Sequence, residues 1–92
     1  MISHTTERFR KLYGNLPEKI RKQARQVYRL FKSDPYYPGL HFKRVHSSRP
    51  IYSVRITKDY RAVGIHQKNE IIWFWIGSHS VYDKLLKQIR HA

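Results

Sequence analysis

The chain has 92 residues, with 19 Lys and Arg against six Asp and Glu, and a formal net charge of +13. Its length allows one domain, residues 1–92, and the lack of cysteine excludes a disulfide framework or a thiolate zinc site. No apolar run approaches the length of a membrane span or a secretory signal, so we expect a cytoplasmic protein. The excess of cations favours a nucleic acid or an acidic protein as partner over a membrane surface.

Two helices are expected first, over residues 5–16 and 17–33. Gly14 and Asn15 are suited to end the first helix, and Pro17 is suited to the first turn of the second. Apolar residues recur at helical spacing in both segments, as Phe9, Leu12, Tyr13 and Leu16, and then as Ile20, Ala24, Val27 and Phe31. The two segments therefore predict a helical hairpin that needs a sheet to pack on.

Four strands are expected next, over residues 41–46, 51–57, 60–66 and 71–76. The connections between them are short and can join only antiparallel neighbours. The last run, I-I-W-F-W-I, is typical of a strand buried on both faces, which Gly77 is expected to end. Ser78 then caps a final helix to about residue 89. The predicted fold class is α+β, an N-terminal helical hairpin packed on a four-stranded antiparallel sheet, with a short C-terminal helix.

The residues that could carry chemistry are cations, a histidine and a tyrosine. The histidines match no metal-binding spacing, so neither a metal nor another cofactor is expected. Cleavage of RNA by its own 2′-hydroxyl needs groups that hold the scissile phosphate, move protons and neutralise charge. Those groups are offered by Arg55, Arg61, His79 and Tyr82, with Lys43, Arg44, His46 and Lys84 as candidate RNA-binding residues.

Each candidate also has a purely structural interpretation. Arg55 and Arg61 could be strand charges facing water, His79 a capping residue, and Tyr82 a core aromatic packed on a tryptophan. The two arginines share a face only if a bulge interrupts the pairing of their strands, for example with Asp59 in the left-handed conformation. A Ser-His-Asp arrangement of Ser78, His79 and Asp83 stays open, although nothing in the spacing supports it.

The hairpin-then-sheet order, with the segments Y-S-V-R-I-T-K-D-Y-R-A-V-G and W-I-G-S-H-S-V-Y-D-K-L-L, resembles the RelE/ParE superfamily of toxins from bacterial type II toxin–antitoxin systems. The resemblance implies a RelE-like fold and an acidic antitoxin as partner. In the ribonuclease branch, whose toxins cut mRNA in the ribosomal A site, it implies that Arg61 binds phosphate. It places His79 where that branch has Arg or His, Tyr82 at a late Tyr, and Arg55 as a supporting cation.

Two departures from the family pattern stand out. The usual N-terminal strand is expected to be missing, because Ile2 is the only apolar residue after Met1 and before the first helix. Ser53 stands where some members carry a cation, which shifts the expected chemistry to Arg61 and His79.

The predicted function is a metal-independent, ribosome-dependent mRNA endoribonuclease that inhibits translation. Two alternatives stay open, a ParE-like DNA gyrase poison without nuclease activity and an inactive basic domain that binds RNA or an antitoxin. The presence of His79 and Tyr82 favours the nuclease, because the gyrase-poisoning branch usually lacks this ending.

Overall fold

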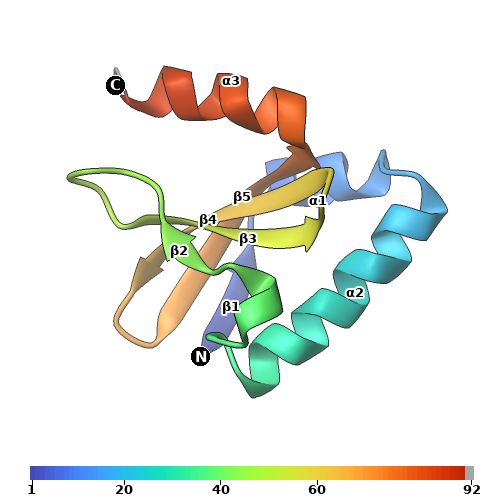
Figure 1. The fold of residues 1–92 in the computed structure, drawn as a ribbon, viewed down its shortest axis with the longest axis horizontal. Helices are drawn as coiled ribbons and strands as arrows, with labels where there is room; N and C mark the ends of the chain where they lie inside the picture. The colour runs from blue at the N-terminus through green and yellow to red at the C-terminus, as the bar shows by residue number, and fades with distance from the viewer. Residues whose placement is uncertain (91–92) are drawn as a thin grey trace.

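A five-stranded mixed sheet, in the order β1-β5-β4-β3-β2, separates a helical hairpin from a third helix (Figure 1). The computed structural model describes residues 1–90. The hairpin of α1 and α2 packs on one face of the sheet and α3 on the other. The elements are β1 (Ile2–Thr5), α1 (Glu7–Gly14), α2 (Glu18–Ser33), the 3₁₀ turn η1 (Pro38–Leu40), β2 (Lys43–Arg44), β3 (Ile51–Thr57), β4 (Tyr60–Gln67), β5 (Glu70–Ser78) and α3 (His79–Arg90).

The N-terminal strand that we expected to be missing is present as β1, so the sheet has five strands and is not purely antiparallel. It pairs in parallel with β5, with Ile2 opposite Glu70 and Thr5 opposite Trp73. Hydrophobic patterning could not reveal this strand, because β1 is an edge strand held largely by backbone hydrogen bonds and Ile2 is 54% exposed.

The predicted helical hairpin is confirmed, with both helices within two residues of the expected bounds. The Thr6 hydroxyl caps α1 by accepting a hydrogen bond from the Phe9 amide at 3.1 Å. The hairpin is held closed by Arg21, whose Nη1 donates to the Gly14 and Leu16 carbonyls. This contact uses one cation of α2 for structure and leaves most of the others exposed.

Three expectations about the strands were wrong. The strand over residues 41–46 is reduced to the two residues of β2, because η1 and a left-handed His41 precede it and the His46 loop follows. Gly77 does not end β5 but lies inside it, opposite Arg61. The run from Ile71 is not buried on both faces throughout, because Ile72 is 43% exposed. The middle strand of the sheet is β4 and not β5.

A bulge in β5 explains how one apolar run serves two cores. The pairing with β4 shifts between Val63, opposite Trp75, and Gly64, opposite Trp73, so Phe74 is the extra residue. Because of this shift, odd-numbered residues before the bulge and even-numbered residues after it face the hairpin. The core beneath the hairpin therefore contains Trp73 and Ile76, whereas the core beneath α3 contains Trp75.

Gly64 is required at this bulge by close packing. A Cβ at this position would lie 2.9 Å from the Ile72 carbonyl oxygen and 2.9 Å from the Trp73 ring.

Within residues 1–90, no helix has the length and apolar character needed to cross a lipid bilayer.

Candidate functional site

Arg55 and Arg61 lie directly opposite each other on β3 and β4, on the face of the sheet that α3 covers. The bulge required for this pairing is present, because Ile56 is an extra residue between Arg55–Arg61 and Thr57–Tyr60. Within residues 1–90 the only non-glycine residues with positive φ are His41 and Lys68, so the suggested left-handed Asp59 is wrong.

The two-residue turn between β3 and β4 organises both Arg61 and the start of α3. Nη1 of Arg61 donates to the carbonyls of Thr57 at 2.6 Å, Lys58 at 3.3 Å and Tyr60 at 2.9 Å. The remaining carbonyl of this segment, that of Asp59, accepts the backbone amide of His79 at 2.7 Å. The turn thereby positions the guanidinium and the histidine at one end of the sheet, which sequence spacing did not reveal.

His79 is the first residue of α3 and is accessible to a ligand, with 46% of its side chain exposed. Its Nδ1 lies 3.3 Å from Oδ2 of Asp83, one helical turn further on. Its ring centroid lies 5.8 Å from that of Tyr82, so the two rings share a face of the helix as the spacing predicts.

Tyr82 occupies the core beneath α3. Its ring is tilted against Trp75 with centroids 6.2 Å apart, and its hydroxyl donates to Oγ of Ser53 at 3.0 Å. The residue is only 6% exposed, so the expected role of stacking on a base does not fit this position. Ser53, which we had noted only as the absence of a cation, is the buried partner of this hydroxyl.

Within residues 1–90, no carboxylate forms an ion pair with Arg55 or Arg61. The ion pairs found in that range are His4–Glu70, Glu7–Lys11 and His79–Asp83. Like charges directly opposite each other on a sheet are destabilising, so the pair is suited to an anion placed between them. The described residues contain no cluster of side chains that could hold a metal ion.

The other candidate RNA-binding residues are dispersed. Lys43 and Lys84 are exposed, on β2 and α3. The guanidinium of Arg44 is directed into the following loop, where Nε donates to the His46 and Arg49 carbonyls. The register places Lys43 opposite Ser53, on the face that carries Arg55, whereas the hydrogen bonds of Arg44 direct it away into the loop.

His46 was wrongly expected to be available to RNA. It is 8% exposed, its Nδ1 accepts the amides of Ser48 and Arg49, and its Nε2 lies 3.0 Å from the Ile89 carbonyl oxygen. Both ring nitrogens are therefore used to fasten the β2–β3 loop to α3. A histidine next to Ser-Ser in a loop gave no signal of this burial.

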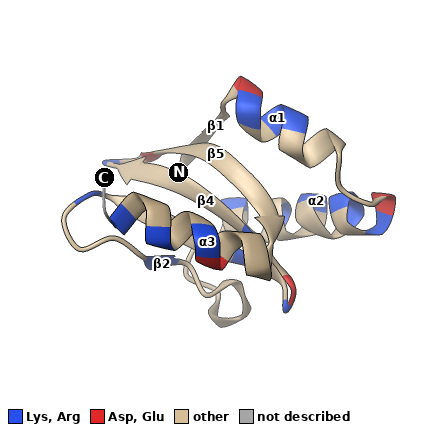
Figure 2. Ribbon diagram, turned by 90° about the horizontal axis from the view of Figure 1, so that it is seen from above, with Lys and Arg blue, Asp and Glu red and all other residues tan. Residues whose placement is uncertain are grey.

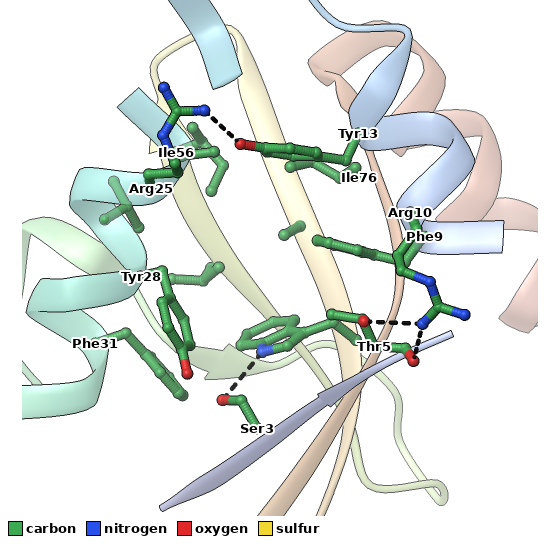
Figure 3. A pocket seen from close by; sticks show the side chains of 15 residues that line it. Ser3, Thr5, Phe9, Arg10, Tyr13, Arg25, Tyr28, Phe31, Ile56 and Ile76 are labelled. Carbon is green, nitrogen blue, oxygen red and sulfur yellow. Dashed lines mark hydrogen bonds between the residues drawn. The ribbon is translucent and has the colours of Figure 1, made fainter. Parts of the chain in front are cut away.

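A second candidate region is an apolar groove of about 350 Å³ between the hairpin and the other face of the sheet (Figure 3). Arg10 and Arg25 lie at its rim, where Arg25 donates to the Tyr13 hydroxyl at 2.8 Å and Arg10 to the Thr5 carbonyl at 2.8 Å. Its lining includes Phe9, Tyr28, Phe31, Val54, Ile56, Trp73 and Ile76. Helical periodicity predicted the buried stripe of α2 but not this groove beside it.

The basic residues are spread over all three helices and are not confined to one site (Figure 2). Acidic residues are few and scattered along the ribbon. A large polyanion or acidic protein could therefore contact this molecule over several faces.

Solved structures of toxins share this fold. The chain superposes on the RelB–RelE antitoxin–toxin complex from Methanococcus jannaschii with a TM-score of 0.71 and 19% identity, covering 88% of this chain and 96% of that one. The YoeB/ParE toxin from Agrobacterium tumefaciens gives 0.68 and 15%, covering 86% and 99%. The isolated E. coli RelE toxin gives 0.64 and 18%, covering 96% and 97%. No curated protein sequence gives a significant match.

The chain thus has the α+β fold of these RelE-type structures. A family model of the ParE-like toxin domain matches residues 18–84, which is more than half of the chain. The protein belongs to this family, within the RelE/ParE superfamily of toxins of toxin–antitoxin systems.

Proposed function

We propose that this toxin is a metal-independent endoribonuclease that cuts mRNA on the ribosome and so inhibits translation. The observation that carries the proposal is the cross-strand pair of Arg55 and Arg61 beside an accessible His79. Two arginines opposite each other on neighbouring strands are suited to a phosphate with two or more anionic oxygens. An imidazole at the same end of the sheet is suited to proton transfer.

The roles follow from these positions. Arg61 holds the scissile phosphate and stabilises the charge that develops on it, and Arg55 adds a second phosphate contact. His79 moves a proton, as the base on the 2′-hydroxyl or as the acid on the leaving oxygen. Tyr82, buried behind His79, supports the imidazole and does not stack on the nucleotide.

Dependence on the ribosome follows from how little the isolated domain supplies. His79 is half exposed, and the carboxylate found beside it within residues 1–90, that of Asp83, is exposed as well. An open site neither orients a flexible RNA nor excludes water, and a bound ribosome would supply that orientation. Lys43, Arg44 and Lys84 then add phosphate contacts outside the reacting centre.

The direct test compares purified toxin on free mRNA and on mRNA bound to programmed ribosomes. We expect feeble cleavage of free RNA, unaffected by chelator, and rapid cleavage of the ribosome-bound message. Strong cleavage of free RNA that EDTA abolishes would contradict the proposal. Expression that damages DNA and leaves mRNA intact would instead place the protein with the gyrase poisons.

We also propose that an acidic antitoxin neutralises the toxin. Support comes from the net charge of +13 and from the apolar groove with arginines at its rim. Such a surface is suited to a partner segment with apolar side chains flanked by carboxylates, which orders as it binds. A pull-down with the product of the neighbouring gene should give a tight, salt-sensitive complex, and no binding would remove this part of the proposal.

A further inference from the structure

One carboxylate of this basic chain stands beside the candidate catalytic histidine. Oδ2 of Asp83 lies 3.3 Å from Nδ1 of His79, on the same side of α3 and one turn further on. The whole chain contains only six acidic residues. A carboxylate at this place repels a bound phosphate and so weakens RNA binding. Its position therefore calls for a reason other than RNA binding.

Two other neighbours flank His79, one at its backbone and one at its ring. Its backbone amide is tied to the Asp59 carbonyl, and its ring lies at 59° to the ring of Tyr82. Tyr82 is itself fixed by its hydrogen bond to Ser53. In this arrangement Nδ1 is the ring nitrogen next to the Asp83 carboxylate, and Nε2 lies at the opposite edge of the ring, where no hydrogen bond is found within residues 1–90.

From this geometry we infer that Asp83 is a positioning residue that selects the tautomer of His79. This role rests on the proposed nuclease function. A carboxylate beside Nδ1 favours the neutral form with the proton on Nδ1 and leaves the lone pair on Nε2. The accessible nitrogen is then a base, and His79 acts on the 2′-hydroxyl and not as the acid on the leaving oxygen.

The step balances with water as the second proton source. Nε2 takes the proton of the 2′-hydroxyl as the 2′-oxygen forms a bond to phosphorus, and the bond from phosphorus to the 5′-oxygen breaks. The leaving 5′-oxygen takes a proton from solvent water. The products are a 2′,3′-cyclic phosphate and a 5′-hydroxyl, and the imidazolium afterwards returns its proton to solvent.

Two readouts separate tautomer control from a merely structural ion pair. Long-range ¹H–¹⁵N spectra of the imidazole, taken where it is neutral, should show the Nδ1–H form in the wild type and a shift towards the Nε2–H form in Asp83→Ala. Single-turnover cleavage on programmed ribosomes should slow about tenfold or more in Asp83→Ala, with the half-saturating toxin concentration unchanged. Asp83→Glu should recover part of the rate.

Controls make the test specific to this pair. Glu7→Ala removes the carboxylate of another exposed i,i+4 pair, Glu7–Lys11 at 3.4 Å, and should leave the rate unchanged. In a His79→Ala background, adding Asp83→Ala should slow cleavage no further.

The outcomes distinguish this inference from the proposed function. If the wild type cuts ribosome-bound mRNA but Asp83→Ala cuts at the same rate or keeps the Nδ1–H tautomer, the positioning role is wrong and the function stands. If the wild type cuts no RNA, the proposed function fails and this role fails with it.

Discussion

The two faces of the sheet carry opposite kinds of surface. Beneath α3, polar groups gather at one end of the sheet, where Arg55, Arg61 and His79 surround the β3–β4 turn. Beneath the hairpin, an apolar groove ends in two arginines whose guanidiniums are already hydrogen-bonded. The net charge of the chain alone does not distinguish these two faces. What separates them is what surrounds the cations: Arg61 lies among turn carbonyls close to the exposed His79, whereas Arg10 and Arg25 form the rim of an apolar surface.

The largest effect on cleavage is expected from removing the polar groups of the α3 face. Arg61→Ala should slow single-turnover cleavage on programmed ribosomes about 10²–10³-fold, because a preorganised charge contact is lost. His79→Ala should slow it about 10²–10⁴-fold through loss of proton transfer. Arg29→Ala, an exposed cation of α2, should cut at the wild-type rate. Circular dichroism confirms that each variant is folded, and wild-type rates for both site variants would show that the chemistry lies elsewhere.

A second variant asks whether a histidine of the α3 side belongs to structure or to RNA binding. His46→Ala should lower the free energy of unfolding by about 1–3 kcal/mol, because it removes a buried side chain and leaves partly buried backbone groups without partners. Cleavage by the folded fraction should stay unchanged. His4→Ala, an exposed histidine, is the control for stability. If His46→Ala slowed cleavage without changing urea denaturation, His46 would contribute to RNA binding and not to stability.

The groove on the other face should respond to a different measurement. Tyr28→Glu places a negative charge in the groove and should weaken antitoxin binding about tenfold, while cleavage by the free toxin is unaffected. Tyr36→Glu makes the same change at an exposed tyrosine outside the groove and should bind normally. Calorimetric titration of each variant measures the difference. Equal affinities would mean that the antitoxin lies on another surface.

The smallest expected effect concerns β1, which forms one wall of the groove. The Ser3 hydroxyl accepts from Nε1 of Trp73 at 3.4 Å, a long bond between partly buried groups. Ser3→Ala should therefore lower the free energy of unfolding by only about 0.5 kcal/mol in urea denaturation. A much larger loss would show that side-chain contacts, and not backbone pairing, hold the N-terminal strand.

Local patterns predicted the parts of the molecule that depend on local physics. The apolar stripes gave both hairpin helices, and the capping residue and periodicity gave α3. They failed for β1, whose pairing partner lies some 70 residues away in the chain and is joined through backbone groups. Backbone pairing leaves no mark on the choice of side chains at an exposed edge.

The candidate site divides in the same way. Residue chemistry identified Arg55, Arg61 and His79, and helical spacing placed His79 beside Tyr82. Whether the two arginines share a face depended on one bulge at Ile56, and no residue type at this position predicts a bulge. The burial of Tyr82 and His46 depended on packing between distant elements, which turned two expected ligand contacts into supports of the fold.

The central claim is that the α3 face promotes attack by the RNA's own 2′-hydroxyl. The most direct measurement uses ribosome-bound mRNA with a single 2′-O-methyl group at the nucleotide preceding the cut, compared with the unmodified message. The account predicts that the methylated message stays intact at that bond and that the unmodified message yields a 2′,3′-cyclic phosphate and a 5′-hydroxyl. Cutting of the methylated bond at the unmodified rate would contradict it.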